Sequence, residues 1–408
     1  MPRMKIVLDA RNTGRAAGTG ITTYTNTLAA ALTGHGHSTI SWLREKSLSG
    51  ILPTTAFHSR QARGIRFLKA LITRKQIASR VLSSTTTDLI SDDLFRIGHV
   101  HFNIYGRLLP VMADDKPDLM HWTCPLPLIM MGCPNIVTIH DLIPILRPEL
   151  CDTNPQRMQK LLQCIIERAN QIVTISNTVR QEIITHFKVP AERVCTIYQA
   201  TNILTELEAL SNLVLRPLPC PVGGFLYMGT IERRKNIGRL IRAHARSRTT
   251  RPLILVGPDG FGAQEELAAL NDHPHPDRVL RVPWLLRNDL IRAIQGARTV
   301  VFPSLAEGFG LPIIEAMALG IPVLTSLGGT TEEIAGHAAY LADPLDIDSI
   351  AEGLIRLDHE DYLHTELAKA GSQRVQYFNI KDYGARFDSL YRDVLSQNRQ
   401  ISQHYSLP

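Results

Sequence analysis

The 408-residue chain has few cysteines, and their spacing excludes several classes of protein. The six cysteines are scattered without CxxC or zinc-ligand spacing, which argues against a zinc finger or a small disulfide-bonded domain. We expect reduced thiols in a cytoplasmic protein. No run of eighteen or more apolar residues occurs, so no transmembrane helix is expected. The first residues, MPRMKIVLDA, lead directly into a strand-like run and do not resemble a signal peptide.

Acidic residues are absent from one long stretch of the chain. No Asp or Glu lies between Lys46 and Thr87, and the cations there include Arg60, Arg63, Arg66, Lys69, Arg74, Lys75 and Arg80. Such a block predicts an anionic partner, although nucleic acid is not expected. Within 60–82, apolar residues recur near helical spacing between the cations. This pattern suits a helix on an anionic membrane, at the inner face of the cell membrane, and equally the solvated face of an ordinary helix.

Short β-branched runs alternate with helical patterns along the whole chain. This alternation predicts an α/β fold with parallel sheets covered by helices. A Pro- and Gly-rich stretch, RPLPCPVGG, is the candidate linker. We predict an N-terminal Rossmann-like domain at 1–215, a C-terminal one at 222–379, and a closing helix at 380–397 that packs back on the first domain. Ligands bind at the carboxyl ends of parallel strands, so the cleft between the domains is the expected site.

Two glutamates flank a glycine-rich turn that follows the run TVVFPS. Glu307 precedes the turn, and Glu315 is expected in the first turn of the helix after it. The backbone N–H groups of Phe309, Gly310 and Leu311 would then lie at a helix N-terminus, where they can bind anions or hydroxyl oxygens. Carboxylates only accept hydrogen bonds, which suits the hydroxyls of a sugar or ribose. The alternative for either acid is a helix cap or a solvated side chain.

A second candidate site follows the run FLYMGT. Arg234 and Lys235 precede the helical pattern KNIGRLIRAHARS, so two cations and a helix N-terminus can converge on a diphosphate. A solvated basic turn is the alternative. Near the start of the chain, Gly18, Thr19 and Gly20 would let the backbone approach a diphosphate and an acceptor closely. This run is not the dinucleotide fingerprint GxGxxG.

Histidines end two other strand-like runs. His140 and Asp141 follow the strand of TIHDLIPI, and His121 follows PDLM. A structural role and a place in the cleft both fit these residues. Asp346 and Asp348 form a DxD pattern, which holds metal in some transferases, but they precede the helix SIAEGLIRL. We therefore predict a helix N-cap there and no metal site.

Together these motifs resemble the retaining glycosyltransferases of family 4. That family has the GT-B fold, in which two Rossmann-like parallel-sheet domains face each other across a deep cleft. The stretch FPSLAEGFGLPIIEAMALGIPVLTS contains the family's E-x7-E signature, and YMGTIERRKNIGRLIRAH resembles its diphosphate-binding strand, loop and helix. In the family, the second Glu holds the ribose of the nucleotide and the first lies by the transferred sugar.

The resemblance implies a set of site residues. The expected catalytic residues are His140, Glu307 and Lys235. The expected donor-binding residues are Arg234, Lys235, Glu315, Phe309, Gly310, Leu311, Pro283 and Gly20. The expected acceptor-side residues are Gly18, Thr19, His121 and Asp141. No metal or other cofactor is expected, because a lysine and helix amides would replace a metal.

The resemblance also implies a reaction. The stretches TIHDLIP and GTIERRKNI look most like bacterial mannosyltransferases of polysaccharide assembly that use GDP-mannose. We therefore expect a hexose to move, with retention of configuration, from a nucleotide sugar to a glycan or a polyprenyl-diphosphate-linked acceptor. Three alternatives stay open. They are a UDP-sugar-dependent transferase of the same family, an epimerase- or phosphorylase-type enzyme on the same fold, and a non-catalytic subunit that binds nucleotide sugar.

Overall fold

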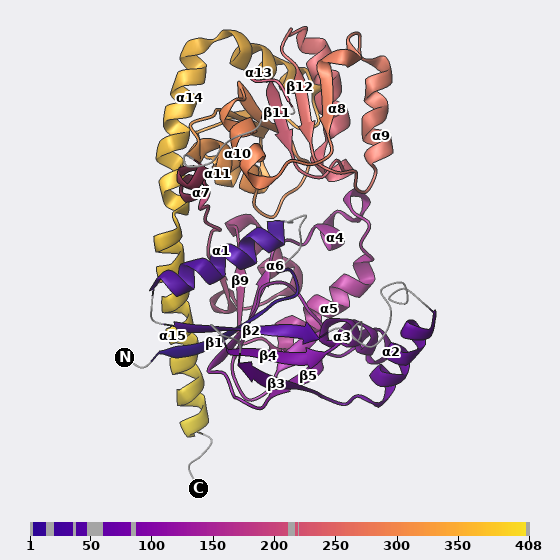
Figure 1. The fold of residues 1–408 in the computed structure, drawn as a ribbon, viewed down its shortest axis with the longest axis vertical. Coiled ribbons are helices and arrows are strands. Elements are labelled where there is room, and N and C mark those ends of the chain that lie inside the picture. Colours follow the sequence, from indigo (N-terminus) through magenta and orange to yellow (C-terminus); the bar gives the residue numbers. More distant parts are fainter. Residues whose placement is uncertain are drawn as a thin grey trace.

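The computed structural model describes residues 3–13, 20–35, 38–46, 60–82, 87–210, 217–218 and 220–404. Its strands form two sheets in two lobes, one above the other in Figure 1. Within the described chain, the first sheet has the strand order β10-β9-β8-β6-β1-β2-β4-β3-β5-β7, and the second has the order β13-β12-β11-β14-β15-β16. Neighbouring strands run parallel except for β3 against β4. The predicted α/β class with parallel sheets is confirmed.

The strands of the first sheet come from the N-terminal half of the chain. They are β1 Met4–Asp9, β2 Ser38–Lys46, β3 Gln76–Leu82, β4 Thr87–Asp92, β5 Leu109–Ala113, β6 Leu119–Trp122, β7 Leu128–Met130, β8 Asn135–Ile139, β9 Gln171–Thr174 and β10 Val194–Thr196. The second sheet contains β11 Phe225–Met228, β12 Leu253–Val256, β13 Val279–Val282, β14 Thr299–Phe302, β15 Val323–Ser326 and β16 Tyr340–Ala342.

Helices cover these sheets and connect the strands (Figure 1). The helices up to the linker are α1 Gly20–His35, α2 Arg60–Ile72, α3 Leu94–Tyr105, α4 Ile143–Leu146, α5 Pro155–Arg168, α6 Asn177–Phe187 and α7 Ile203–Leu210. After it come α8 Ile237–Ser247, α9 Ala263–Leu267, α10 Arg287–Gln295, α11 Leu311–Ala318, α12 Gly329–Ala335, α13 Ile347–His359, α14 Asp361–Arg374 and α15 Ile380–His404.

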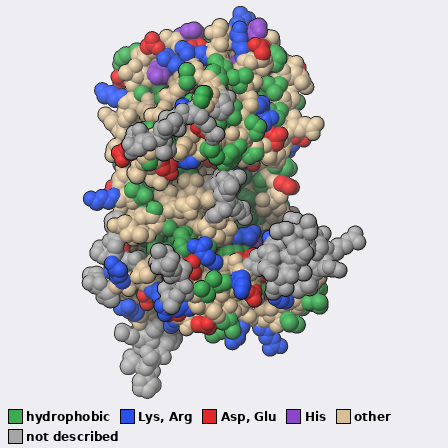
Figure 2. All heavy atoms as spheres, viewed as in Figure 1, with side chains coloured by type: hydrophobic (Ala, Val, Ile, Leu, Met, Phe, Trp, Pro, Cys, Tyr) green, Lys and Arg blue, Asp and Glu red, His purple; other side chains and the backbone are tan. Residues whose placement is uncertain are grey.

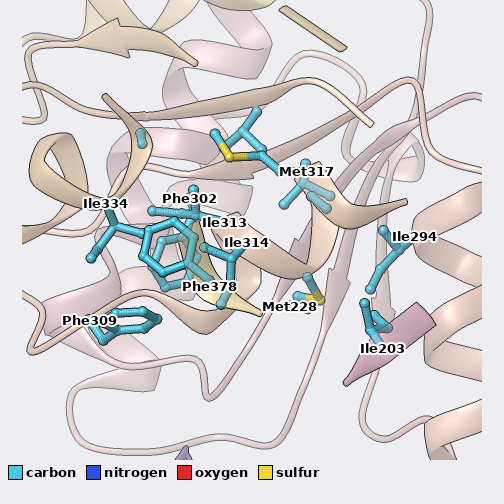
Figure 3. Packing of buried hydrophobic residues seen from close by; sticks show 14 of the residues in the cluster. Ile203, Met228, Ile294, Phe302, Phe309, Ile313, Ile314, Met317, Ile334 and Phe378 are labelled. Atoms are coloured by element: carbon cyan, nitrogen blue, oxygen red, sulfur yellow. The ribbon is translucent and has the colours of Figure 1, made fainter. Parts of the chain in front are cut away.

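The central strands of the second sheet are buried on both faces. All four residues of β11, of β12 and of β14 are buried, as expected for parallel strands with helices on either side. Figure 3 shows the core of the second lobe, in which the Phe309 and Phe378 rings meet edge to face with centroids 5.8 Å apart. This core holds the ends of β11 and β14 in place, and both strands lead into the candidate site.

The last helix lies against the first lobe. The α15 residue Tyr391 is fully buried, and its hydroxyl lies 2.7 Å from His121 Nδ1 at the end of β6. The Nε2 atom of His121 lies 2.8 Å from the Thr138 hydroxyl. Burial lowers the pKa of His121 to about 3, so the ring is neutral. The structure therefore does not place His121 on an acceptor-facing surface, because both ring nitrogens are engaged inside the lobe.

The basic segment 60–82 is not one helix. Helix α2 ends at Ile72, where the Thr73 N–H donates to the Lys69 carbonyl, and strand β3 begins at Gln76. Residues 76–82 form a strand of the first sheet, because β3 pairs with β4 on one side and with β5 on the other. Across the described residues, no helix combines the length and apolar character that crossing a membrane requires.

Candidate functional site at the lobe junction

The carboxylate of Glu307 lies between two cations. Arg234 Nη1 donates to Glu307 Oε2 and Lys235 Nζ donates to Glu307 Oε1, each at 2.6 Å. The cations come from the loop after β11, and the acid comes from the loop after β14, the neighbouring strand. The structure thus brings Glu307 to two adjacent cations that lie more than seventy positions earlier, at the carboxyl ends of β11 and β14. Glu232, which the sequence reasoning left out, also accepts from Arg234, at 2.6 Å.

Burial and charge oppose each other in this cluster. The Glu307 side chain is only 8% exposed. Burial alone would raise its pKa, but Arg234 and Lys235 outweigh that effect and hold the pKa at about 2. Burial, with the charge of Arg234 added, lowers the pKa of Lys235, and its Nζ atom lies 4.5 Å from the centre of the Phe302 ring. The cluster is therefore an internally neutralised cation pair, with Glu307 and Glu232 as the counterions.

The turn after Glu307 requires glycine for steric reasons. A Cβ atom on Gly308 would overlap the carbonyl oxygen of His140 in the first lobe, so the two lobes touch at this point. Gly310 has φ of +105°, a conformation that side chains disfavour, and α11 begins at Leu311. Within the described residues, the N–H groups of Phe309 and Gly310 donate to no other backbone or side-chain acceptor. The Phe309 ring is buried in the core, so only its backbone is available to a ligand.

His140 lies across the lobe junction from this turn. Its Nε2 atom lies 2.8 Å from the Thr123 carbonyl oxygen, and because a carbonyl only accepts, Nε2 carries the proton. Burial lowers the pKa of the ring, so His140 is neutral and its Nδ1 is a hydrogen-bond acceptor. Burial raises the pKa of Asp141 against the opposing charge of Arg234, and its Oδ1 accepts from the Ile143 N–H at 3.0 Å.

Asp9 supports the segment that holds His140, and the sequence reasoning did not identify it. The Asp9 side chain at the end of β1 is fully buried, and its Oδ2 accepts from the Thr123 N–H at 2.5 Å. Thr123 thus links Asp9 to His140 through its two backbone groups. Burial raises the pKa of Asp9 to about 6, against the effect of these hydrogen bonds. Its position at the carboxyl end of the first strand was the sequence feature that could have indicated a place near the site.

Glu315 is paired rather than free. It is the fifth residue of α11, which places it beyond the first helical turn where the sequence placed it. Its Oε1 accepts from Arg287 Nη2 at 2.7 Å, and only 7% of its side chain is exposed. Sequence reasoning missed Arg287, because nothing local connects it to an acid 28 positions later. Pro283 is exposed before α10, Gly20 begins α1, and the predicted acceptor-side residues 18 and 19 lie outside the described residues.

A second contact joins the lobes away from Glu307. Glu333 of α12 accepts from the N–H groups of Asn177 and Thr178 at the start of α6, at 2.6 and 2.8 Å. It also accepts from the Thr178 hydroxyl and from the Tyr198 hydroxyl. One carboxylate of the second lobe thus caps a helix of the first lobe.

The DxD pattern caps a helix, as predicted. Asp346 precedes α13, and its Oδ1 accepts from the Asp348 N–H at 2.9 Å. The Asp348 side chain pairs with Arg246. Both acids are therefore engaged in local structure on the second lobe.

Family models match both halves of the chain. Residues 18–203 match the model described as Glycosyltransferase Family 4, and residues 224–374 match Glycosyl transferases group 1. The O-antigen chain mannosyltransferase B of Escherichia coli is 32% identical over 259 residues, which is 59% of this chain and 66% of that protein. The serotype-specific mannosyltransferase WbdA of the same species is 31% identical over 57% of this chain and 30% of its own length. The matches thus span less than two thirds of these relatives.

Solved structures share the whole architecture. Sucrose-phosphate synthase from Thermosynechococcus elongatus superposes with a TM-score of 0.68 at 20% identity, covering 97% of this chain and 100% of that one. The Anabaena protein HepE, solved with UDP-glucose, gives a TM-score of 0.62 at 16% identity, with coverage of 97% and 100%. At these identities the likeness concerns the fold, and the expected GT-B architecture is confirmed.

Proposed function

The chain belongs to glycosyltransferase family 4, and from that premise we propose that it transfers mannose from GDP-mannose to a glycan or lipid-linked glycan, with retention of configuration. The observation that carries the proposal is the cluster of Glu307 with Arg234 and Lys235, beside the turn that touches His140. Two cations and the unengaged amides of Phe309 and Gly310 are suited to the negative charge of a leaving diphosphate. The mannosyltransferase relatives support mannose as the transferred sugar.

The geometry of Glu307 favours attack on the face that the diphosphate leaves. A carboxylate nucleophile needs a free oxygen, and both oxygens of Glu307 accept from cations. We therefore propose that the bond from the sugar C1 to phosphate breaks with its electron pair passing to the diphosphate. The acceptor oxygen then bonds to C1 on the same face, and its proton passes to a phosphate oxygen. Neutral His140 would accept a hydrogen bond from the sugar through Nδ1.

Product analysis tests the donor, the acceptor and the stereochemistry together. GDP-mannose, UDP-glucose and other nucleotide sugars are supplied with a polyprenyl-diphosphate-linked glycan, and the product is examined by NMR. We expect turnover with GDP-mannose and an α-linked product. A β-linked product would exclude retention, and a glycosyl adduct trapped on Glu307 would exclude same-face attack. Sugar release without an acceptor product would indicate the epimerase- or phosphorylase-type alternative.

We further propose that the first lobe docks on an anionic membrane surface. Helix α2 leaves Leu68 63% exposed and Ile72 79% exposed, and Lys69 lies between them. Ile77 and Met112 are neighbours in the β3–β5 register, and both are exposed. Figure 2 shows basic and hydrophobic side chains mixed over the lower lobe. Exposed apolar groups beside cations are typical of reversible binding to anionic lipid.

Vesicle binding tests this docking. The protein should bind phosphatidylserine vesicles more tightly than phosphatidylcholine vesicles, and added salt should weaken the binding. Replacing Lys69, Arg74 and Lys75 by glutamine should abolish the preference. A control with the same charge change in the second lobe replaces Arg242, Arg248 and Lys369. Equal binding to both vesicle types, or an equal loss in the control, would exclude the proposal.

A further inference from the structure

Arg287 connects Glu315, in the candidate donor site, to helix α7, which precedes the linker. It is the first residue of α10 and donates from Nη2 to Glu315 Oε1 and from Nε to Glu206 Oε2, both at 2.7 Å. Glu206 lies on α7, the last described helix before the linker. One guanidinium thus holds two carboxylates from elements that are far apart in sequence. The Glu315 side chain is the most buried of the three, at 7% exposed against 37% for Arg287 and 31% for Glu206.

We propose that Arg287 is a positioning residue for nucleotide recognition, which fixes Glu315 so that its Oε2 receives the ribose hydroxyls of the donor. This inference rests on the proposed function. In the described chain Oε2 receives no hydrogen bond of its own, whereas Oε1 is held by Arg287. A buried carboxylate with one oxygen held by an arginine has restricted rotation, so its second oxygen keeps a preferred direction. A site of that kind selects a ribose over a deoxyribose.

The chemistry of arginine suits this role. A guanidinium offers donors in a rigid plane, so one side chain can fix two acids in a defined orientation. Burial would lower the pKa of Arg287, but Glu315 and Glu206 outweigh it and raise the pKa, so the cation is permanent. Lysine at this position would supply charge without the planar fork. Because Arg287 contacts Glu315 and not the reacting groups, its loss should weaken donor recognition more than it slows the chemical step.

The test measures ribose discrimination by calorimetry. GDP, UDP and their 2′-deoxy and 3′-deoxy analogues are titrated into the wild type. We expect the preferred diphosphate to bind at least tenfold tighter than one of its deoxy analogues, as a hydrogen bond to a charged group predicts. In Arg287→Gln that ratio should fall below about threefold, with a raised donor KM and a nearly unchanged kcat. Arg287→Lys should restore part of the ratio.

Two controls separate a specific effect from a structural one. Arg292→Gln removes a cation from the same helix, where Arg292 lies 3.5 Å from Asp289, and it should keep the wild-type ratio. Glu206→Gln removes only the outer carboxylate and should give an intermediate ratio, even if Arg287→Gln folds poorly. Unchanged discrimination in Arg287→Lys and Glu206→Gln, or tighter nucleotide binding in Arg287→Gln, would overturn the inference alone. A wild type that binds neither diphosphate would overturn the proposed function as well.

Discussion

Replacing Glu307 by glutamine should destabilise the protein by about 3 kcal/mol. Glu307 is buried between Arg234 and Lys235, which hold its pKa at about 2, well below the ordinary value of 4.5 for a glutamate. The difference of about 2.5 in pKa, at about 1.4 kcal/mol for each pKa unit, gives roughly 3 kcal/mol. Glutamine keeps the shape of the protonated acid but leaves Lys235 without a carboxylate partner and Arg234 with Glu232 alone. Breaking a buried ion pair typically costs about 3–5 kcal/mol, which agrees with this value.

Urea unfolding at several pH values is the assay. The pKa of Glu307 is lower in the folded state, so its contribution is fully present above pH 4.5 and is lost as the pH falls toward 2. The stability gap between wild type and Glu307→Gln should therefore be constant near neutral pH and narrow below pH 4.5. The matched control is Glu366→Gln, at an exposed position on α14. A stability difference between wild type and Glu307→Gln below about 0.5 kcal/mol near neutral pH, as is usual for surface changes, would refute the reasoning. A stability difference that stays the same at every pH would refute it too.

Three further outcomes are expected. Gly308→Ala should lower kcat strongly and the melting temperature only slightly, because the new Cβ overlaps the His140 carbonyl oxygen and the lobes can separate to relieve the overlap. A large loss of melting temperature with an unchanged kcat would contradict this. Glu333→Gln should enlarge the radius of gyration in solution scattering, because the cap on Thr178 is weakened, and an unchanged radius would count against it. Burial lowers the pKa of His244, so its ring is neutral in the folded state, whereas the unfolded chain gains a proton there as the pH drops below 6.5. The melting temperature should therefore decrease as the pH is lowered from 6.5, and this decrease should be smaller in His244→Asn.

The sequence predicted the parts of the site that lie in local motifs. Arg234 and Lys235 were expected at the end of one strand and Glu307 at the end of another, and parallel strands bring such ends to one edge. What the motifs could not reveal was the pairing. No local motif indicated that Glu307 would bind both cations or that Glu315 would bind Arg287.

The misplaced residues share a physical reason. His121 lies near the carboxyl end of β6, where ligands of parallel sheets are expected to bind. Helix α15 returns from the second lobe, however, and the Tyr391 hydroxyl contacts the His121 ring. Segment 60–82 has helical spacing, yet its second half pairs with β4 and β5. In both cases a partner from elsewhere in the chain decided the outcome, and local periodicity carries no information about such partners.

The neutralised cluster gives Glu307 two roles that work against each other. In the described structure both of its oxygens accept from the cations that a diphosphate would use. Binding a donor therefore exchanges one anion for another, and the cost of separating Glu307 from the cations reduces the apparent affinity. It follows that Glu307→Gln should lose folding stability without losing affinity for a nucleoside diphosphate, because Lys235 and the Nη1 group of Arg234 are then released from the carboxylate. Lys235→Met, in contrast, should lose affinity. Turnover should fall in both variants, since sugar transfer needs the acid and the cation together. Calorimetry with GDP and UDP distinguishes the roles: weaker diphosphate binding in Glu307→Gln would mean that the acid organises the site rather than competing for it.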